Sequence, residues 1–234
     1  MIGVQEKNYK SYFFNSLNYS VIVVYLLFVI FPIIWIALLS LKNEVQAFAN
    51  PPLFIFKPYF MNYYNLFIEE NFGKYLFNSI VVATLSSIIC LLIGAPTAFA
   101  LSRNQNKVNR GILIWVLISR MAPAMTYVIP FFVVFSYFKM IDTYFGLILA
   151  YSVLNLPLVI WLMRSFFLEL PSETLEAAKI DGASIFQIFR KIAIPLASPG
   201  IVSTGIITFV VAWNEFIFAL VLTRRHAVTA QIGI

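Results

Sequence analysis

The sequence predicts an all-α polytopic membrane helix bundle, and its composition is the first reason. Hydrophobic residues make up 61% of the 234 residues, whereas charged residues make up only 11%. A soluble domain carries about 25% charged residues because it must present them to water. The composition therefore excludes a soluble globule. We expect one transmembrane domain over residues 1–234.

Long apolar segments are the second reason, because a transmembrane helix needs about 20 mainly apolar residues. Five segments meet this requirement, at 21–41, 80–100, 112–138, 144–163 and 201–222. Prolines occur inside several of them, and neighbouring helices can satisfy the backbone groups that a proline frees. The first segment is longer than the apolar run of a signal peptide, about 7–15 residues, so we expect it to stay uncleaved.

Basic residues in the loops indicate how the bundle is oriented, because cytoplasmic loops carry an excess of lysine and arginine. The short loop 102–110 contains Arg103, Lys107 and Arg110 and no acidic residue. This bias favours a cytosolic N-terminus and places residues 164–200 in the cytosol. The net charge of +6 is scattered at helix ends, so we expect contact with a lipid bilayer and none with nucleic acid.

The cytosolic segment 164–200 is predicted to begin with a short helix. Pro171 suits a helix start, since the first turn does not use the missing N–H. The helix is expected to run to about Ile180. Gly182 is well placed to end it, because glycine adopts the left-handed conformation without a steric clash.

A second short helix is predicted to follow the turn. Ser184 and Gln187 form the capping-box pattern that begins a helix. We expect this helix to end before Pro195. The two helices would form a hairpin on the cytosolic face, either as a docking element or only as a cap on the bundle.

Four polar residues inside the apolar segments are candidates for the translocation pathway or gate: Arg120, Asn155, Asn214 and Glu215. Charges in a membrane span are costly and usually face a protein interior or a wet cavity. Other interpretations stay open. Arg120 could reach the cytosolic surface, Asn155 could accompany a packing kink, and the Asn214–Glu215 pair could contact another subunit.

Enzymatic function is disfavoured by the scarcity of reactive side chains. The sequence has one histidine, His226, and one cysteine, Cys90, which lies in an apolar segment and suggests a buried thiol. We therefore predict no catalytic residue, metal site or cofactor on this chain.

No phosphate-binding Gly-x-x-x-x-Gly-Lys-Ser/Thr loop occurs, so any ATP must bind elsewhere. A stand-alone transporter or channel would often show internal repeats, and none is clear.

The predicted hairpin resembles the EAA loop of ABC importer permeases. That family's pattern is Glu-Ala-Ala, three residues, Gly, nine residues and Ile-x-Leu-Pro. The corresponding residues are Glu176-Ala177-Ala178, Gly182 and Ile192-x-Ile194-Pro195. The only departure is isoleucine at position 194, which is a conservative change.

Further motifs resemble the carbohydrate branch of that family, which contains the maltose-type second permease. They are Asn78-Ser79, Arg120-Met121-x-Pro123, Ile129-Pro130, Asp181-Gly182-Ala183, Leu196-Ala197-x-Pro199-Gly200 and Trp213-Asn214-Glu215-Phe216. The resemblance covers about residues 75–223. It implies the fold of a type I ABC importer permease, usually with six spans. Because the sequence shows five, we expect a sixth-helix tail beyond Ile234, with a shortened variant as the alternative.

The resemblance also implies a mechanism and its partners. Glu176 would be the charged contact to a separate ATPase subunit, with Ala177 and Ala178 as the close-packed surface and Asp181, Gly182 and Pro195 as further parts of the coupling motif. Expected partners are an ATPase dimer carrying ATP and Mg, a second homologous permease and an extracytoplasmic solute-binding protein.

The sequence thus predicts a multi-pass permease subunit of a binding-protein-dependent ABC importer in a bacterial or archaeal cytoplasmic membrane. The expected substrate is a sugar, polyol or related carbohydrate. The alternatives are an importer for a non-sugar solute and a stand-alone transporter or channel.

Overall fold

The computed structural model describes residues 9–104 and 106–233, and within these residues every regular element is a helix. The contacts divide the chain into two compact units, Met1–Glu70 and Asn71–Ile234. This division is finer than the single domain expected from the sequence. Each unit is described by itself.

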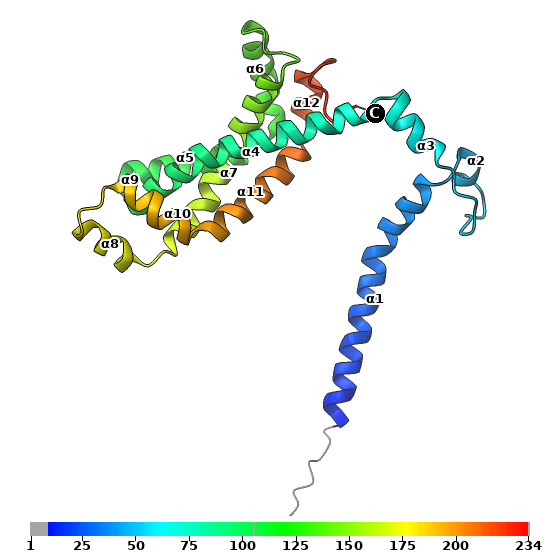
Figure 1. Ribbon diagram of the computed structural model, residues 1–234, viewed down its shortest axis with the longest axis horizontal. Helices are drawn as coiled ribbons and strands as arrows, with labels where there is room; N and C mark the ends of the chain where they lie inside the picture. The colour runs from blue at the N-terminus through cyan, green and yellow to red at the C-terminus, as the bar shows by residue number, and fades with distance from the viewer. Residues whose placement is uncertain (1–8, 105, 234) are drawn as a thin grey trace, which may run out of the picture. The chain divides into compact units, whose positions relative to one another are not determined.

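The first unit contains one long helix followed by short ones (Figure 1). Its helices are α1 (Tyr9–Ser40), α2 (Glu44–Ala47), α3 (Met61–Tyr64) and the π-helical η1 (Asn65–Glu69). Residues Asn18–Ser40 are long and apolar enough to cross a membrane. The predicted segment 21–41 is therefore a candidate span, within a helix that starts earlier than expected.

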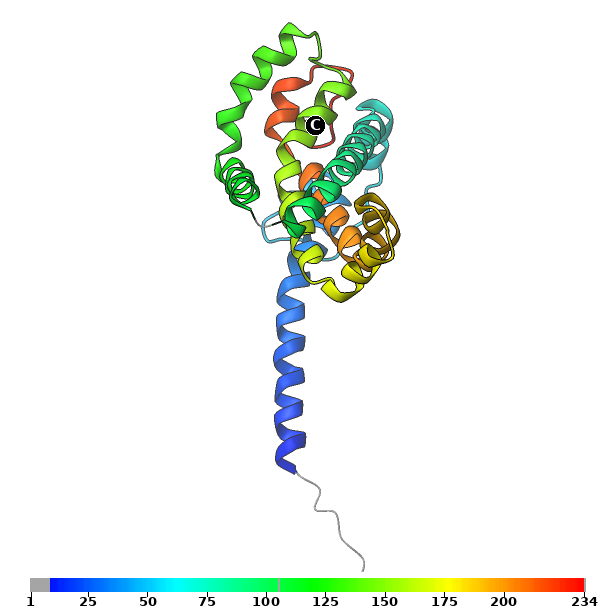
Figure 2. The same ribbon diagram turned by 90° about the vertical axis from the view of Figure 1, so that its left-hand side faces the viewer.

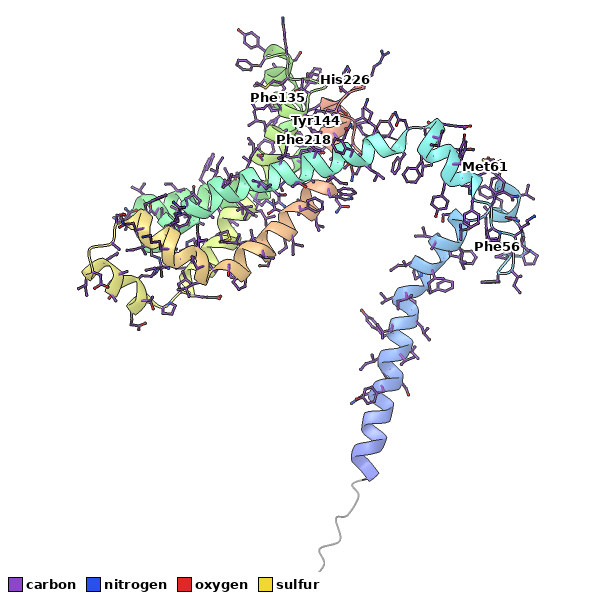
Figure 3. All side chains as sticks on the ribbon, in the orientation of Figure 1. Phe56, Met61, Phe135, Tyr144, Phe218 and His226 are labelled. Carbon is purple, nitrogen blue, oxygen red and sulfur yellow. The ribbon has the colours of Figure 1, made fainter. Side chains whose placement is uncertain are left out.

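A buried lysine stabilises the end of this span. Lys42 is only 4% exposed, and its ammonium group donates a hydrogen bond to the Leu53 carbonyl at 2.7 Å. The same nitrogen lies 4.9 Å from the ring centroids of Trp35 and Phe56, within cation–π range. Figure 3 labels Phe56 on the segment that folds back toward α3. A buried cation is thus compensated by one carbonyl and two rings.

The second unit is built on two long helices, α4 (Phe72–Arg103) and α7 (Tyr144–Leu168), which contact each other more extensively than any other pair of described elements. Helix α11 (Ser198–Trp213) packs against both. Three shorter helices pack beside them, α5 (Lys107–Met121), α6 (Ala124–Tyr137) and α12 (Ile217–Leu222). Helix α5 packs on α7, and α12 packs on α6 and α7.

Small residues allow these helices to approach closely, as is common between membrane helices. A Cβ atom on Gly94 would lie 2.7 Å from Val159 Cγ1, and one on Gly200 would lie 2.4 Å from the Phe166 ring. Cys90 is fully buried at the α4–α7 contact and donates to the Ser152 carbonyl. The predicted buried thiol is therefore confirmed.

Two large apolar cores lie along α4 and α7, beside a smaller one formed by Leu101, Val116 and Ile160. One includes Phe99, Met163 and Phe167, near the end of both helices. The other joins Tyr151 to Phe135 and Phe218, from α6 and α12. Figure 3 labels Phe135 and Phe218 close together on these elements.

Two predicted spans agree with the structure in position. The segment 80–100 lies within α4, and 144–163 lies within α7. Both helices are longer than expected and keep their internal prolines, Pro96 and Pro157.

The other two predicted spans are wrong as single helices. The segment 112–138 is two helices, α5 and α6, which meet at a bend of 95°. Ala122 has ψ 134, the extended conformation favoured before a proline, and Pro123 is the N-cap residue before α6 begins at Ala124. The segment 201–222 is interrupted between Trp213 and Ile217. A second bent pair consists of Ile185–Leu196 and Ser198–Trp213, which meet at 77°. The described part thus has three membrane-length helices, or up to five spans if each of the two bent pairs counts as one.

Candidate coupling hairpin and polar cavity

The first helix of the predicted hairpin forms where the sequence places it. Helix α8 spans Ser172–Ile180 and follows Pro171 directly. The turn after it depends on Gly182, which has φ +83. A side chain at position 182 would meet nothing within 4 Å, so the backbone conformation, and not packing, requires glycine here.

The second helix also begins as predicted, but it ends later. The amide of Ser184 donates to Gln187 Oε1 at 2.8 Å, and the amide of Gln187 donates to Ser184 Oγ at 3.3 Å, which confirms the capping box. The helix continues through α9 (Ile185–Ile188), the π-helical η2 (Phe189–Ala193) and α10 (Ile194–Leu196). The expected end before Pro195 is wrong. Pro195 lies in α10, directly after the π-helical turn.

The inner face of the hairpin is fixed to the ends of α4 and α7. Leu175 and Ile188 are buried in the core that contains Phe99 and Phe167. The guanidinium of Arg103 lies over the Phe99 ring and donates a hydrogen bond to the Phe167 carbonyl. The hairpin is therefore anchored to two long helices at one end of the unit, as Figures 1 and 2 show.

The outer face of the hairpin is exposed and partly apolar. Glu176, Ala177 and Asp181 are exposed, whereas Ala178 is half-buried against the core. Beside them lie three large apolar side chains whose exposure was not predicted from the sequence. These are Ile180, Ile185 and Phe186, with exposed fractions of 85%, 71% and 67%. The sequence signal for this exposed apolar surface was the position of Ile180, Ile185 and Phe186 on either side of the polar turn at Asp181 and Gly182.

Glu176 also faces a cavity on the flank of the hairpin. This cavity has a volume of about 190 Å³ and is lined by Glu176 and Lys179 from α8 and by Arg103 from α4. Glu176 thus shares this cavity with the positive side chains of Lys179 and Arg103, and it is also exposed at the surface.

Three of the four candidate pathway residues line one small cavity. Arg120 at the end of α5, Asn155 in the middle of α7, and Glu215 between α11 and α12 surround about 70 Å³. Asn155 is buried, whereas Arg120 is exposed. Asn214 does not line this cavity, and its amide donates to the Val210 carbonyl at 2.7 Å. The structure therefore brings together polar side chains from three separate predicted spans.

Glu215 has a structural role at the interruption of the last predicted span. One oxygen of its carboxylate accepts hydrogen bonds from the amides of Ile217 and Phe218, at 3.1 and 3.2 Å. It thereby satisfies donors at the start of α12, as a helix cap does. The Glu215 carboxylate thus takes the place of the backbone carbonyls that would accept from these amides in a continuous helix.

A larger apolar cavity adjoins the polar one. It has a volume of about 360 Å³ and lies between α5, α6 and α7. Ser119, Tyr127 and Leu154 line both cavities. Trp115 and Phe131 add aromatic surface. Sequence reasoning did not find this cavity, because the 95° bend that places α6 beside α7 was not predicted.

At the opposite end of the unit, Asn78 and Ser79 hold the last described segment. Asn78 is fully buried, donates to the carbonyls of His226 and Val228 and accepts from the Tyr144 hydroxyl. Ser79 Oγ accepts from the amide of Ala230 at 2.8 Å. Figure 3 shows Tyr144 and His226 close to the start of α4.

Asp142 organises a loop at this same end. Its carboxylate accepts hydrogen bonds from four consecutive backbone amides, those of Arg224, Arg225, His226 and Ala227. Partial burial raises the pKa of Asp142, but these four donors outweigh it, so its pKa lies below the usual value.

Acidification is expected to loosen the 224–227 loop. Because the folded pKa of Asp142 is depressed, its stabilisation is complete above the unfolded value, about 3.9, and is lost as the pH falls through the folded value. Asp142→Asn should raise amide exchange in residues 224–227 already at pH 7. Asparagine also tolerates the positive φ of 61 found here, so backbone strain does not confound the comparison. Hydrogen-exchange mass spectrometry checks this, and unchanged protection in the variant would contradict it.

Together these features define a class of protein: a helical membrane transport subunit with polar groups inside the bundle and an exposed hairpin at one end. Residues 90–233 match the family described as "Binding-protein-dependent transport system inner membrane component". The chain belongs to this family of ABC importer permeases, which are transport subunits and not enzymes.

Two curated relatives illustrate the similarity. The "Probable ABC transporter permease protein y4oR" of Sinorhizobium fredii is 37% identical over 87% of this chain and 73% of the relative. The "Trehalose transport system permease protein SugB" of Mycobacterium tuberculosis is 36% identical over 88% of this chain and 76% of the relative. The resemblance to carbohydrate permeases is thereby confirmed.

A solved structure has the same fold. It is described as a bacterial ABC transporter involved in the import of the acidic polysaccharide alginate. The TM-score is 0.78 with 23% identity, over 98% of this chain and 80% of that one. The predicted fold class is thereby confirmed.

Proposed function

We propose that this chain couples ATP hydrolysis on a separate subunit to carbohydrate import through the hairpin 171–196. The observation that carries the proposal is the two-sided character of the hairpin. Its inner side chains are buried among residues of α4 and α7, whereas Glu176, Ile180 and Phe186 are exposed. An exposed apolar patch beside charged residues is typical of a protein–protein contact.

The partner on this face is an ATPase dimer that binds ATP and Mg. Glu176, Ala177, Ala178, Asp181, Gly182 and Pro195 form the coupling motif, with Glu176 as the charged contact. The N-terminus is cytosolic, which is supported by the basic residues at the start of α5, at the same end of the unit as the hairpin. The other partners are a second homologous permease and an extracytoplasmic solute-binding protein.

The substrate is a sugar, polyol or related carbohydrate. Trehalose, sulfoquinovosyl glycerol and diacetylchitobiose are named in three relatives of this chain. The polar cavity formed by Arg120, Asn155 and Glu215 lies on the translocation pathway or its gate. Asn214 lies next to Glu215, in the interruption between α11 and α12.

Affinity purification of the tagged chain from its native membranes in mild detergent tests the proposal. Mass spectrometry is expected to identify an ATPase and a second permease in stoichiometric amounts. The copurifying or neighbouring binding protein can then be screened against sugars and against non-sugar solutes. Recovery of this chain alone, stable and monodisperse, would contradict the coupling function.

A further inference from the structure

A third cavity lies at the hairpin end of the unit but outside the hairpin. It has a volume of about 280 Å³ and is formed by the end of α4, the first turn of α5 and the last part of α7. Its lining residues are Leu101, Asn104, Asn109, Arg110, Leu113 and Arg164. Two of these are arginines, and none is acidic.

Arg164 has an unsatisfied hydrogen-bond donor. The side chain is half-buried, and its Nε atom is buried without a hydrogen-bond partner. Leaving a buried donor of a charged group unpaired is costly, and native structures rarely do so without a ligand, an ion or water. Because the cavity is lined by two arginines and by no acidic residue, an anion is the ligand that matches its charge.

The start of α5 adds to the positive potential. Asn106 caps this helix by accepting from the Asn109 amide at 2.8 Å. The first turn contains Lys107 and Arg110 and no acidic residue. The N-terminal end of a helix already carries partial positive charge, so two cations there are unfavourable unless an anion compensates them.

The position and lining of the cavity indicate which anion fits. Helix α4 ends at Arg103 and the bent pair α5–α6 starts at Lys107, so the cavity lies at the end of the candidate spans. Leu101 and Leu113 supply an apolar side and the arginines a charged one. Arginine pairs well with phosphate because its planar guanidinium donates two parallel hydrogen bonds.

We propose that this cavity binds a phosphate group, with Arg164 and Arg110 as its ligands. The group comes from an anionic phospholipid head group or from free phosphate. Basic cavities between membrane helices at the cytoplasmic side bind such head groups in general. Phosphate binding at this cavity does not depend on transport or on the ATPase. The phosphate site and the coupling function of the hairpin can therefore be disproved separately.

Native mass spectrometry of the purified full chain, titrated with phosphatidylglycerol and with phosphatidylcholine, tests this site. Wild-type protein is expected to retain phosphatidylglycerol at least tenfold more tightly than phosphatidylcholine. Arg164→Gln should reduce this preference at least fivefold. Arg110→Gln should do the same, and because Arg110 is exposed, its replacement leaves the core intact if Arg164→Gln fails to fold.

Lys107→Gln is the matched control, since Lys107 is exposed on the same turn but does not line the cavity. It should change the preference less than twofold. Competition by millimolar inorganic phosphate would identify free phosphate as the ligand, and no competition would identify the head group. Equal retention of both lipids together with no binding of inorganic phosphate, or equal effects of Lys107→Gln and Arg110→Gln, would overturn the proposal.

Discussion

Ala178→Pro is expected to abolish assembly with the ATPase, because it breaks α8 in its interior. A proline there removes a helical N–H donor and clashes with the preceding turn, at a cost of about 3 kcal/mol. Helix α8 has only nine residues, so it has little length to spare. Ala178 also packs against the core under the hairpin. Pull-down of the ATPase by the variant measures the effect.

Ser172→Pro is the matched control for this experiment. Position 172 is the first residue of α8, where proline is tolerated. The preceding Pro171 has ψ 121, which is compatible with a following proline. ATPase recovery should therefore stay near the wild-type level. Normal assembly of Ala178→Pro would show that the helical form of α8 is not needed for docking.

Glu176→Lys is expected to uncouple transport with little change in folding. Glu176 is exposed, so the substitution disturbs no buried core. It places a positive charge beside Lys179 and Arg103, which line the same cavity. Reversing a charge at an interface replaces attraction by repulsion. We expect at least a tenfold loss of ATPase affinity, about 1.4 kcal/mol, and a matching loss of substrate-stimulated ATP hydrolysis.

Glu173→Lys provides the comparison on the same helix, one turn earlier. It reverses the same type of charge at an exposed position that lies outside the Glu176 cavity. The coupling assignment requires Glu176→Lys to weaken ATPase binding clearly more than Glu173→Lys does. If both variants assemble and transport like the wild type, Glu176 is not the coupling contact.

Local patterns predicted the hairpin well. The start at Pro171, the turn at Gly182 and the Ser184–Gln187 capping box each depend on residues within a few positions of one another. Such features are set by backbone conformation and neighbouring side chains. Hydropathy likewise located the central parts of α4 and α7, because a long apolar segment needs no tertiary information to be recognised.

Tertiary features could not be predicted in the same way. The 95° bend at Ala122–Pro123 and the interruption at Glu215 both lie inside long apolar segments, and the polar residues there do not by themselves show that the backbone changes direction. The meeting of Arg120, Asn155 and Glu215 depends on those breaks. The cavity around Arg164 and its unpaired Nε could not be predicted either, because they form only once α4, α5 and α7 are packed together.

The aromatic cluster under the hairpin has a mechanical consequence. Phe189 of the hairpin lies 5.3 Å from the Phe99 ring and 6.2 Å from the Phe167 ring, measured between centroids. Phe99 belongs to α4 and Phe167 to α7. Because packed rings resist compression, a torque applied to the hairpin acts on both helices at once. A displacement of Phe189 would therefore reach α4 and α7 together, and not one of the two helices alone.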